Sequence, residues 1–126
     1  MIFFDTSAWV EYFIGSSRGQ KIREILEGDE NIATPIIVLI ELSCKAYKEN
    51  TDFNAQLGFI RQNSAIINLD EDIVLDIGKI YAEMKKKNKK TSLADAVIAT
   101  ISVSHGAVLI TCDSDFKGLG NVQIIS

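Results

Sequence analysis

Four acidic residues stand beside apolar runs in this chain, where the end of a buried strand or the first turns of a helix are expected. The first of them, Asp5, directly follows the apolar run Met1–Phe4. A carboxylate at the end of a buried strand is costly unless a positive charge meets it. The other three are Glu41, Asp95 and Asp113. We therefore expect the rest of the chain to act as a scaffold that brings these four carboxylates together.

Such a cluster has a definite chemistry. Two carboxylates about 5 Å apart repel by about 3 kcal/mol at an effective dielectric constant near ~20. Only protons or cations make the cluster tolerable. Hard oxygen ligands without histidine or thiolate favour Mg²⁺ or Mn²⁺ over zinc. Together, the four acids predict a divalent-metal site.

Each acid also has a simpler explanation when it is taken alone. Asp5 and Asp113 could cap the helix or turn that follows them. The other two each have a partner on their own helix, at capping-box or i, i+4 spacing: Asp95 with Ser92, and Glu41 with Lys45. The metal-site interpretation is favoured because it accounts for all four positions at once.

Short apolar runs alternate with helical patterns along the chain. The five expected strands are Met1–Phe4, Asn31–Thr34, Ala65–Leu69, Ala107–Thr111 and Val122–Ile125. The expected helices run from Thr6 or Ser7 to Gly15, from Ser16 or Ser17 to Gly28, from Ile36 to Lys48, from Thr51 through Ile60, from Asp70 or Asp72 to the lysines at 85–90, and from Leu93 to Ser104. Their expected N-caps include Thr6 or Ser7, Thr34 (with Pro35 in the first turn), Thr51 and Ser92.

This alternation predicts an α/β fold with a mainly parallel central sheet of four to five short strands flanked by helices. Ligands of such sheets bind beyond the carboxyl ends of the strands. Asp5 and Asp113 come just past two strands, and Glu41 and Asp95 lie early in helices. All four can therefore face one rim of the sheet.

Length and composition set the remaining limits. We expect a single domain over residues 1–126, since no Pro/Gly/Ser-rich stretch offers a linker. A formal net charge of −4 argues against binding nucleic acid by bulk charge. Asp5 interrupts the apolar start, so no signal peptide is expected, and Ile36–Ile40 is too short to span a membrane. Two cysteines give no disulfide framework or zinc spacing, and a cytoplasmic location is expected.

The ordered set of motifs resembles one known family. Met1–Ser7, a short strand that ends in Asp followed by Thr and Ser, resembles the opening of PIN domains. Glu41 in Ile-Glu-Leu and Asp95 in Ser-Leu-Ala-Asp-Ala-Val-Ile-Ala look like the second and third acids of that family. Residues 111–116, Thr-Cys-Asp-Ser-Asp-Phe, resemble its T-x-D-x-D-F turn, with Asp113 as the fourth acid. The resemblance covers the whole chain, whose small size is similar to that of VapC toxins of VapBC toxin–antitoxin pairs.

The resemblance implies an Mg²⁺- or Mn²⁺-dependent endoribonuclease that cleaves RNA with a metal-activated water, as the toxin of a type II toxin–antitoxin pair. Carried over to this sequence, the residues that hold metal are Asp5, Glu41, Asp95 and Asp113. Thr6, Ser7 and Thr111 are expected to orient ligands or waters, while Asp115 is either a fifth acid of the site or an exposed charge. The implied partners are RNA and a cognate antitoxin protein, and we expect a homodimer.

Basic residues outside these motifs offer one more candidate surface. Five lysines, which could contact the RNA backbone or could simply complement a helix end, are Lys85, Lys86, Lys87, Lys89 and Lys90.

Two other functions remain open at this stage. The first is an Mg²⁺-dependent phosphotransfer or phosphatase domain, although Ser7 occupies the place of the second aspartate in an Asp-x-Asp motif. The second is a non-catalytic PIN-like module that binds RNA or protein, which a missing acid would favour. The sequence does not say which RNA is cut, or whether one or two metals bind.

Overall fold

A single parallel sheet forms the centre of the protein. The computed structural model describes residues 1–126 and contains the strands β1 (Ile2–Phe4), β2 (Ile32–Pro35), β3 (Ala65–Ile67), β4 (Val108–Thr111) and β5 (Val122–Ile124). Their spatial order is β3-β2-β1-β4-β5, and every neighbouring pair is parallel. The predicted α/β architecture with four to five mainly parallel strands is confirmed.

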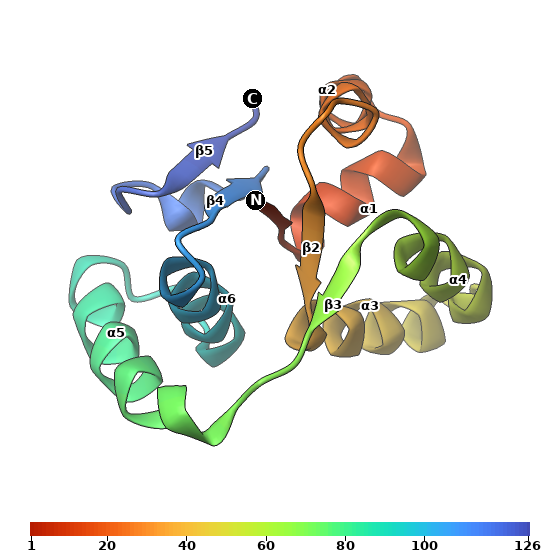
Figure 1. Cartoon of the computed structure of the whole chain (residues 1–126). Helices are drawn as coiled ribbons and strands as arrows, with labels where there is room; N and C mark the ends of the chain where they lie inside the picture. The colour runs from red at the N-terminus through yellow and green to blue at the C-terminus, as the bar shows by residue number, and fades with distance from the viewer.

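Six α-helices and two short 3₁₀ turns connect the strands. They are α1 (Thr6–Ile14), α2 (Ser17–Leu26), α3 (Ile36–Glu49), α4 (Phe53–Asn63), η1 (Glu71–Ile73), α5 (Val74–Lys87), α6 (Leu93–Ser104) and η2 (Ser114–Phe116). In Figure 1, α5 and α6 lie on the side of β4 and β5, whereas α1, α2 and α4 lie on the side of β2 and β3. No helix combines the length and the apolar character that a membrane crossing requires.

The order of the strands places the functional candidates. The chain runs outward from β1 to β2 and β3, and then returns to add β4 and β5 on the other side of β1. The chain order therefore reverses between β1 and β4, whose register pairs Phe4 with Ile110. In a parallel sheet a crevice opens beyond the carboxyl ends of the strands at this reversal. Asp5 and Asp113 are among the first residues after these two strands.

The helix starts differ from the sequence expectation at four places. One is α5, which begins at Val74, because Asp70 precedes the 3₁₀ turn η1 instead. Asp5, and not Thr6 or Ser7, caps α1, and Asp52 takes the place expected for Thr51 at α4. Thr34 caps no helix: its hydroxyl contacts the indole nitrogen of Trp9 (3.1 Å) and the hydroxyl of Ser64 (2.8 Å) inside the core. Asp oxygens reach the N2 or N3 amide as well as Thr oxygens do. Residue type alone therefore could not identify the N-cap where several such residues are adjacent.

An aromatic cluster fixes α1 on the sheet. Trp9 is fully buried and lies against Phe4 with ring centroids 5.2 Å apart. On its other sides it meets Phe13 (5.8 Å) and Phe59 of α4 (6.2 Å). Aromatic pairs at these separations add to the stabilisation from burial. Because α1 is held in this way, its first turn, which follows Asp5, has a defined place at the end of β1.

Candidate active site

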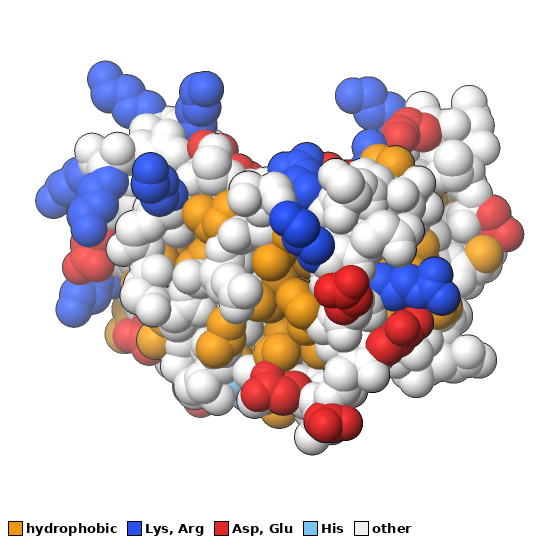
Figure 2. Space-filling view, turned by 90° about the horizontal axis from the view of Figure 1, so that it is seen from above, with side chains coloured by type: hydrophobic (Ala, Val, Ile, Leu, Met, Phe, Trp, Pro, Cys, Tyr) orange, Lys and Arg blue, Asp and Glu red, His pale blue; other side chains and the backbone are white.

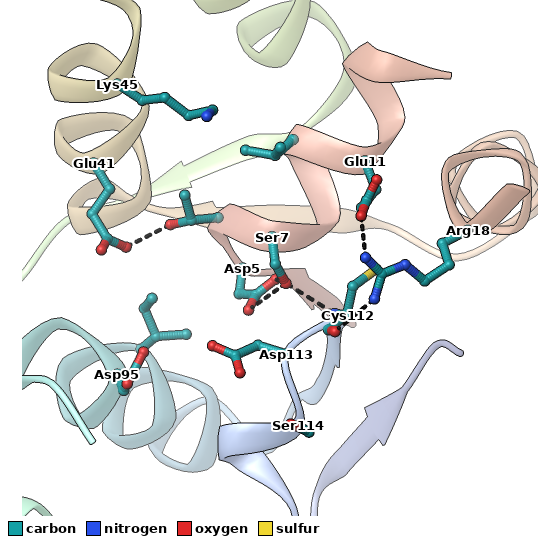
Figure 3. Close-up of a pocket in the computed structure, with 13 residues that line it drawn as sticks. Asp5, Ser7, Glu11, Arg18, Glu41, Lys45, Asp95, Cys112, Asp113 and Ser114 are labelled. Atoms are coloured by element: carbon teal, nitrogen blue, oxygen red, sulfur yellow. Dashed lines mark hydrogen bonds and ion pairs between the residues drawn. The ribbon is translucent and has the colours of Figure 1, made fainter. Parts of the chain in front are cut away.

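All four predicted acids line one pocket of about 520 Å³ at the carboxyl ends of β1 and β4. Asp5, Glu41, Asp95 and Asp113 come from four separate segments of the chain, and Figure 3 shows them around a common space. The structure thus places Asp5 and Asp113, which are 108 positions apart in the sequence, on the same pocket. The catalytic role of the four acids stays a prediction.

Asp5 is the most enclosed member of this group. Its side chain is 2% exposed, because it sits between β1, the start of α1 and the end of β4. Its Oδ1 accepts a hydrogen bond from the backbone N–H of Ala8 (2.9 Å), and its Oδ2 accepts one from the hydroxyl of Thr111 (2.5 Å). The carboxylate therefore caps the helix and still borders the pocket, so the capping and metal-site interpretations do not exclude each other.

Two hydroxyl groups connect Asp5 to the turn that carries Asp113. The Ser7 hydroxyl lies 2.8 Å from Oδ1 of Asp5 and accepts the backbone N–H of Cys112 (2.9 Å). The Thr111 hydroxyl, which donates to Asp5, accepts the backbone N–H of Asp113 (2.9 Å). These bonds tie the ends of β1 and β4 together, so Ser7 and Thr111 lie where orienting residues were expected.

Asp113 and Asp115 have different surroundings, although they are two positions apart. Asp113 lines the pocket, and its Oδ1 accepts the backbone N–H of Asp115 (2.8 Å), which starts η2. Asp115 does not line the pocket, and its Oδ1 accepts a hydrogen bond from the side chain of Asn88 (3.0 Å). The structure therefore places Asp115 beside the site and bonds it to the loop before α6.

Glu41 projects from α3 on the opposite side of the pocket. Its Oε1 accepts a hydrogen bond from the hydroxyl of Thr6 (2.5 Å). The ion pair between Glu41 and Lys45 that the spacing allowed is not formed, because Lys45 contacts Glu49 instead (2.8 Å). Glu41 thus has no positive partner.

Asp95 lies in the first turn of α6 and completes a capping box. Its Oδ2 accepts the backbone N–H of Ser92 (2.9 Å), while its own N–H donates to the Ser92 hydroxyl (3.1 Å). The S-x-x-D pattern is therefore a true cap, and the same carboxylate lines the pocket. One oxygen is engaged with the backbone and leaves the other without a protein partner.

Three of these carboxyl groups hold protons more tightly than usual. Burial raises the pKa of Asp5 from 3.8 to about 6, although its hydrogen bonds oppose the shift and the charge of Asp113 adds to it. Burial also raises the pKa of Glu41, with contributions from the charges of Asp95 and Asp113. The pKa of Asp95 is raised by burial and by the charges of Asp113 and Asp115. Each group is therefore desolvated and repelled by its neighbours.

The donor set fits a hard divalent cation. It consists of carboxylate oxygens alone, none of the four forms a salt bridge, and the charge of Asp113 raises the pKa of each of the other three. The four groups ring the pocket without converging, since no three His, Cys, Asp or Glu side chains are gathered closely enough to hold a metal ion. The chemistry of the donors therefore suits Mg²⁺ or Mn²⁺, while their positions form no closed coordination cage.

The pocket also has three charged residues that the sequence interpretation missed or assigned elsewhere. Glu11 and Arg18 form an ion pair on its α1–α2 side, and Arg18 also donates to the carbonyl oxygen of Cys112 (3.1 Å). The hydrogen bond from Ser16, together with Arg18, lowers the pKa of Glu11. Lys45 is the third. Glu11 and Lys45 could have been predicted from spacing. Glu11 stands four residues after Ser7 and Lys45 four residues after Glu41, which puts each pair on one helix face.

The predicted lysine cluster lies away from the pocket lining. None of Lys85, Lys86, Lys87, Lys89 and Lys90 lines the pocket. Lys85 has a structural part, because its Nζ donates to the carbonyl oxygens of Lys89 (2.7 Å) and Thr91 (3.0 Å) and so closes the turn before α6. Figure 2 shows Lys and Arg side chains gathered at the end of the molecule where α5 lies. Their contact with RNA stays a prediction.

Comparison with known proteins gives consistent matches. The family model described as PIN domain matches residues 2–122. Ribonuclease VapC11 of Mycobacterium tuberculosis is 30% identical over 129 aligned residues, which cover 97% of this chain and 93% of that protein.

Two solved structures with the same fold come from VapBC or toxin–antitoxin assemblies. VapBC2 from Rickettsia felis, bound to a DNA fragment from its promoter, gives a TM-score of 0.78 at 22% identity and covers all of both chains. A toxin–antitoxin complex from Klebsiella pneumoniae gives 0.73 at 24% identity, covering 100% of this chain and 98% of that one. At these identities the likeness establishes the fold of the chain.

Proposed function

Because this chain belongs to the PIN domain family, we propose that it is a metal-dependent endoribonuclease that hydrolyses RNA phosphodiester bonds at the acid pocket. The observation that supports the proposal most strongly is that four carboxylates without a positive partner line one pocket at the reversal point of the sheet. The 30% identity to ribonuclease VapC11 over nearly the whole chain supports the same activity. We propose that residues 1–126 act as one domain.

We assign Asp5, Glu41, Asp95 and Asp113 as the residues that would hold Mg²⁺ or Mn²⁺. When bound, such an ion supplies positive charge that stabilises the transition state and lowers the pKa of a bound water. The chain's own part is to hold the four carboxylates in fixed orientations around one pocket. Ser7 and Thr111 orient Asp5, Thr6 orients Glu41, and the Ser92 cap orients Asp95.

The two alternative functions find less support in the site. A phosphatase of the Asp-x-Asp class needs a second carboxylate two positions after Asp5. Ser7 stands there and is hydrogen-bonded to Asp5. A non-catalytic module would be favoured by an acid that is missing or turned away from the pocket, and all four acids line it.

We further propose that the protein is the toxin of a type II toxin–antitoxin pair. The Rickettsia felis neighbour is a VapBC assembly, the Klebsiella pneumoniae neighbour is a toxin–antitoxin complex, and the Mycobacterium tuberculosis relative is named ribonuclease VapC11. A cognate antitoxin is then the natural protein partner, and a homodimer is expected. Ile40 (52% exposed) and Leu93 (60% exposed) are close in sequence to Glu41 and Asp95 and offer apolar surface for such contacts.

RNA cleavage by the purified protein tests the activity. We expect cleavage in Mg²⁺ or Mn²⁺ and none in EDTA, with recovery on adding metal back. Asp95→Asn should abolish cleavage, because it keeps the cap and removes a charge from the pocket. Asp76→Asn is the matched control, since Asp76 is exposed on α5 and does not line the pocket. Equal activity of the two variants, or full activity in EDTA, would contradict the proposal.

Expression in a bacterial host tests the toxin assignment separately. The wild-type chain should arrest growth when expressed alone, and Asp95→Asn should not. Normal growth despite strong expression of the soluble, active wild type would indicate a housekeeping ribonuclease.

A further inference from the structure

A second pocket of about 210 Å³ opens directly beside the acid pocket. Val10 of α1 and Lys45 of α3 line both pockets, so the two spaces are adjacent. The walls of the second pocket are mixed. Their apolar part includes Phe13, Leu42 and the buried Ala46, and their polar part consists of Lys45, Glu49, Thr51 and Gln56. A ligand that enters the acid pocket over Lys45 can therefore extend into this second space.

Lys45 forms an ion pair in the structure, but the pair is exposed and weak. Its Nζ contacts Glu49 at 2.8 Å, but the side chains of Lys45 and Glu49 are 49% and 43% exposed. Exposed ion pairs of this kind are weak. Figure 3 shows Lys45 extending from α3 over the pocket, on the same side as Glu41. A phosphate group placed there can replace Glu49 as the partner of Lys45 with little loss of free energy.

Gln56 gives the second pocket a polar edge. It is half-buried on α4 and lines the pocket. The side-chain hydrogen bonds of α4 and its N-cap are made by Asp52 and Asn63 at the two ends of the helix, and Gln56 has none. A free carboxamide offers one donor–acceptor pair, which matches the polar edges of nucleobases.

We propose that the second pocket binds the base of the nucleotide next to the scissile phosphate, and that Lys45 binds the phosphate that joins the two. This inference rests on the proposed ribonuclease function. Unpaired bases present flat apolar faces and polar edges, and proteins read them with apolar walls and a few hydrogen-bonding groups. The second pocket has both features, and a cation stands where the connecting phosphate must pass. An apolar side chain of a protein partner would leave the carboxamide of Gln56 without a hydrogen-bond partner.

Two variants with matched controls test the inference in the Asp5→Asn background, which is expected to bind RNA without cutting it. Lys45→Gln is paired with Lys48→Gln on the same helix, and Gln56→Ala with Gln62→Ala, which lies on another pocket. The probes are short single-stranded homopolymers of A, C, G and U, with affinity measured by fluorescence anisotropy over a range of salt concentrations.

The two variants should weaken RNA binding in different ways. Lys45→Gln should weaken binding of all four probes alike, and should reduce the slope of log affinity against log salt by about 0.7, the value for one lost single-strand phosphate contact. Gln56→Ala should weaken binding of one or two probes by about tenfold and leave the others unchanged, because it removes contacts to a base edge. Both controls should bind as the background protein does.

Thermal melts first establish that each variant is folded. If folded Lys45→Gln and Gln56→Ala bind every probe as their controls do, the second pocket serves a protein segment or nothing, and the inference is overturned. If the Asp5→Asn background binds none of the probes and the wild type cuts no RNA, the ribonuclease proposal itself fails and this inference with it.

Discussion

The two sides of the acid pocket are built differently. On the strand side, Asp5 is buried and held by the Ala8 amide and the hydroxyls of Ser7 and Thr111. On the helix side, Glu41 is half-buried and has one side-chain partner, the Thr6 hydroxyl. A buried carboxylate with several donors has one position, whereas a partly solvated one with a single donor can move. We infer that the strand side sets the geometry of the site and the helix side adapts to the ligand.

The largest effect is expected from Asp5 itself. Asp5→Asn removes the charge from the fixed side while keeping its size. Cleavage should fall by about 10³-fold or more, as for the loss of one main electrostatic group in an active site. Initial rates on a fluorogenic RNA give the measurement, with circular dichroism to establish the fold. Residual activity within tenfold of wild type would mean that Asp5 serves only as a helix cap.

The pH dependence of stability of the metal-free protein is the next largest effect. The pKa of Asp5 is about 6 in the fold against an ordinary 3.8, so the folded state binds this proton more tightly than the unfolded state does. Its stabilising contribution is fully present below pH 3.8 and is lost as the pH rises through 6. At pH 7 the loss is up to about 3 kcal/mol.

Urea unfolding at several pH values, in the presence of EDTA, measures this effect as the difference between wild type and Asp5→Asn. The variant should gain stability relative to wild type from pH 4 to pH 7. A constant difference over this range would show that Asp5 is not the titrating group. Mg²⁺ added at pH 7 should stabilise the wild type, because it neutralises the same charge.

Removing the hydroxyl of Thr111 tests the strand side of the pocket without changing any of the four carboxylates. Thr111→Val keeps the shape of the side chain and deletes both the donor to Asp5 and the acceptor for the Asp113 amide. Activity should fall by about 10- to 100-fold, as for other residues that orient a ligand-binding carboxylate. Stability should fall by about 1–3 kcal/mol, because buried polar groups lose their partners. Rate assays and denaturant unfolding give the two values.

The same change on the helix side should have the smallest effect. Thr6→Val removes the only side-chain partner of Glu41, but water can reach this carboxylate and replace the bond. We expect less than a tenfold loss of activity and about 1 kcal/mol or less of stability. If Thr6→Val reduced activity and stability as much as Thr111→Val in the same assays, the inferred difference between the two sides would be wrong.

Much of the fold followed from local patterns. The strand at 2–4 and the helix at 93–104 lie where the apolar runs placed them, because hydrophobic periodicity and burial act over a few neighbouring residues. Helix starts were predicted less well: Thr34 is drawn into the core by Trp9, a contact that no local pattern contains.

The sequence by itself determined that four acids follow or flank apolar elements, and this was enough to predict a common acidic rim. Only the tertiary structure decided what surrounds them. Thr111 and Asp5 are 106 positions apart and meet because β4 adds beside β1. Lys45 lines the pocket and the lysines at 85–90 do not, since α3 packs beside β2 whereas α5 packs against α6. The sequence places a charged residue on a helix, but only the packing of that helix decides which surface the charge faces.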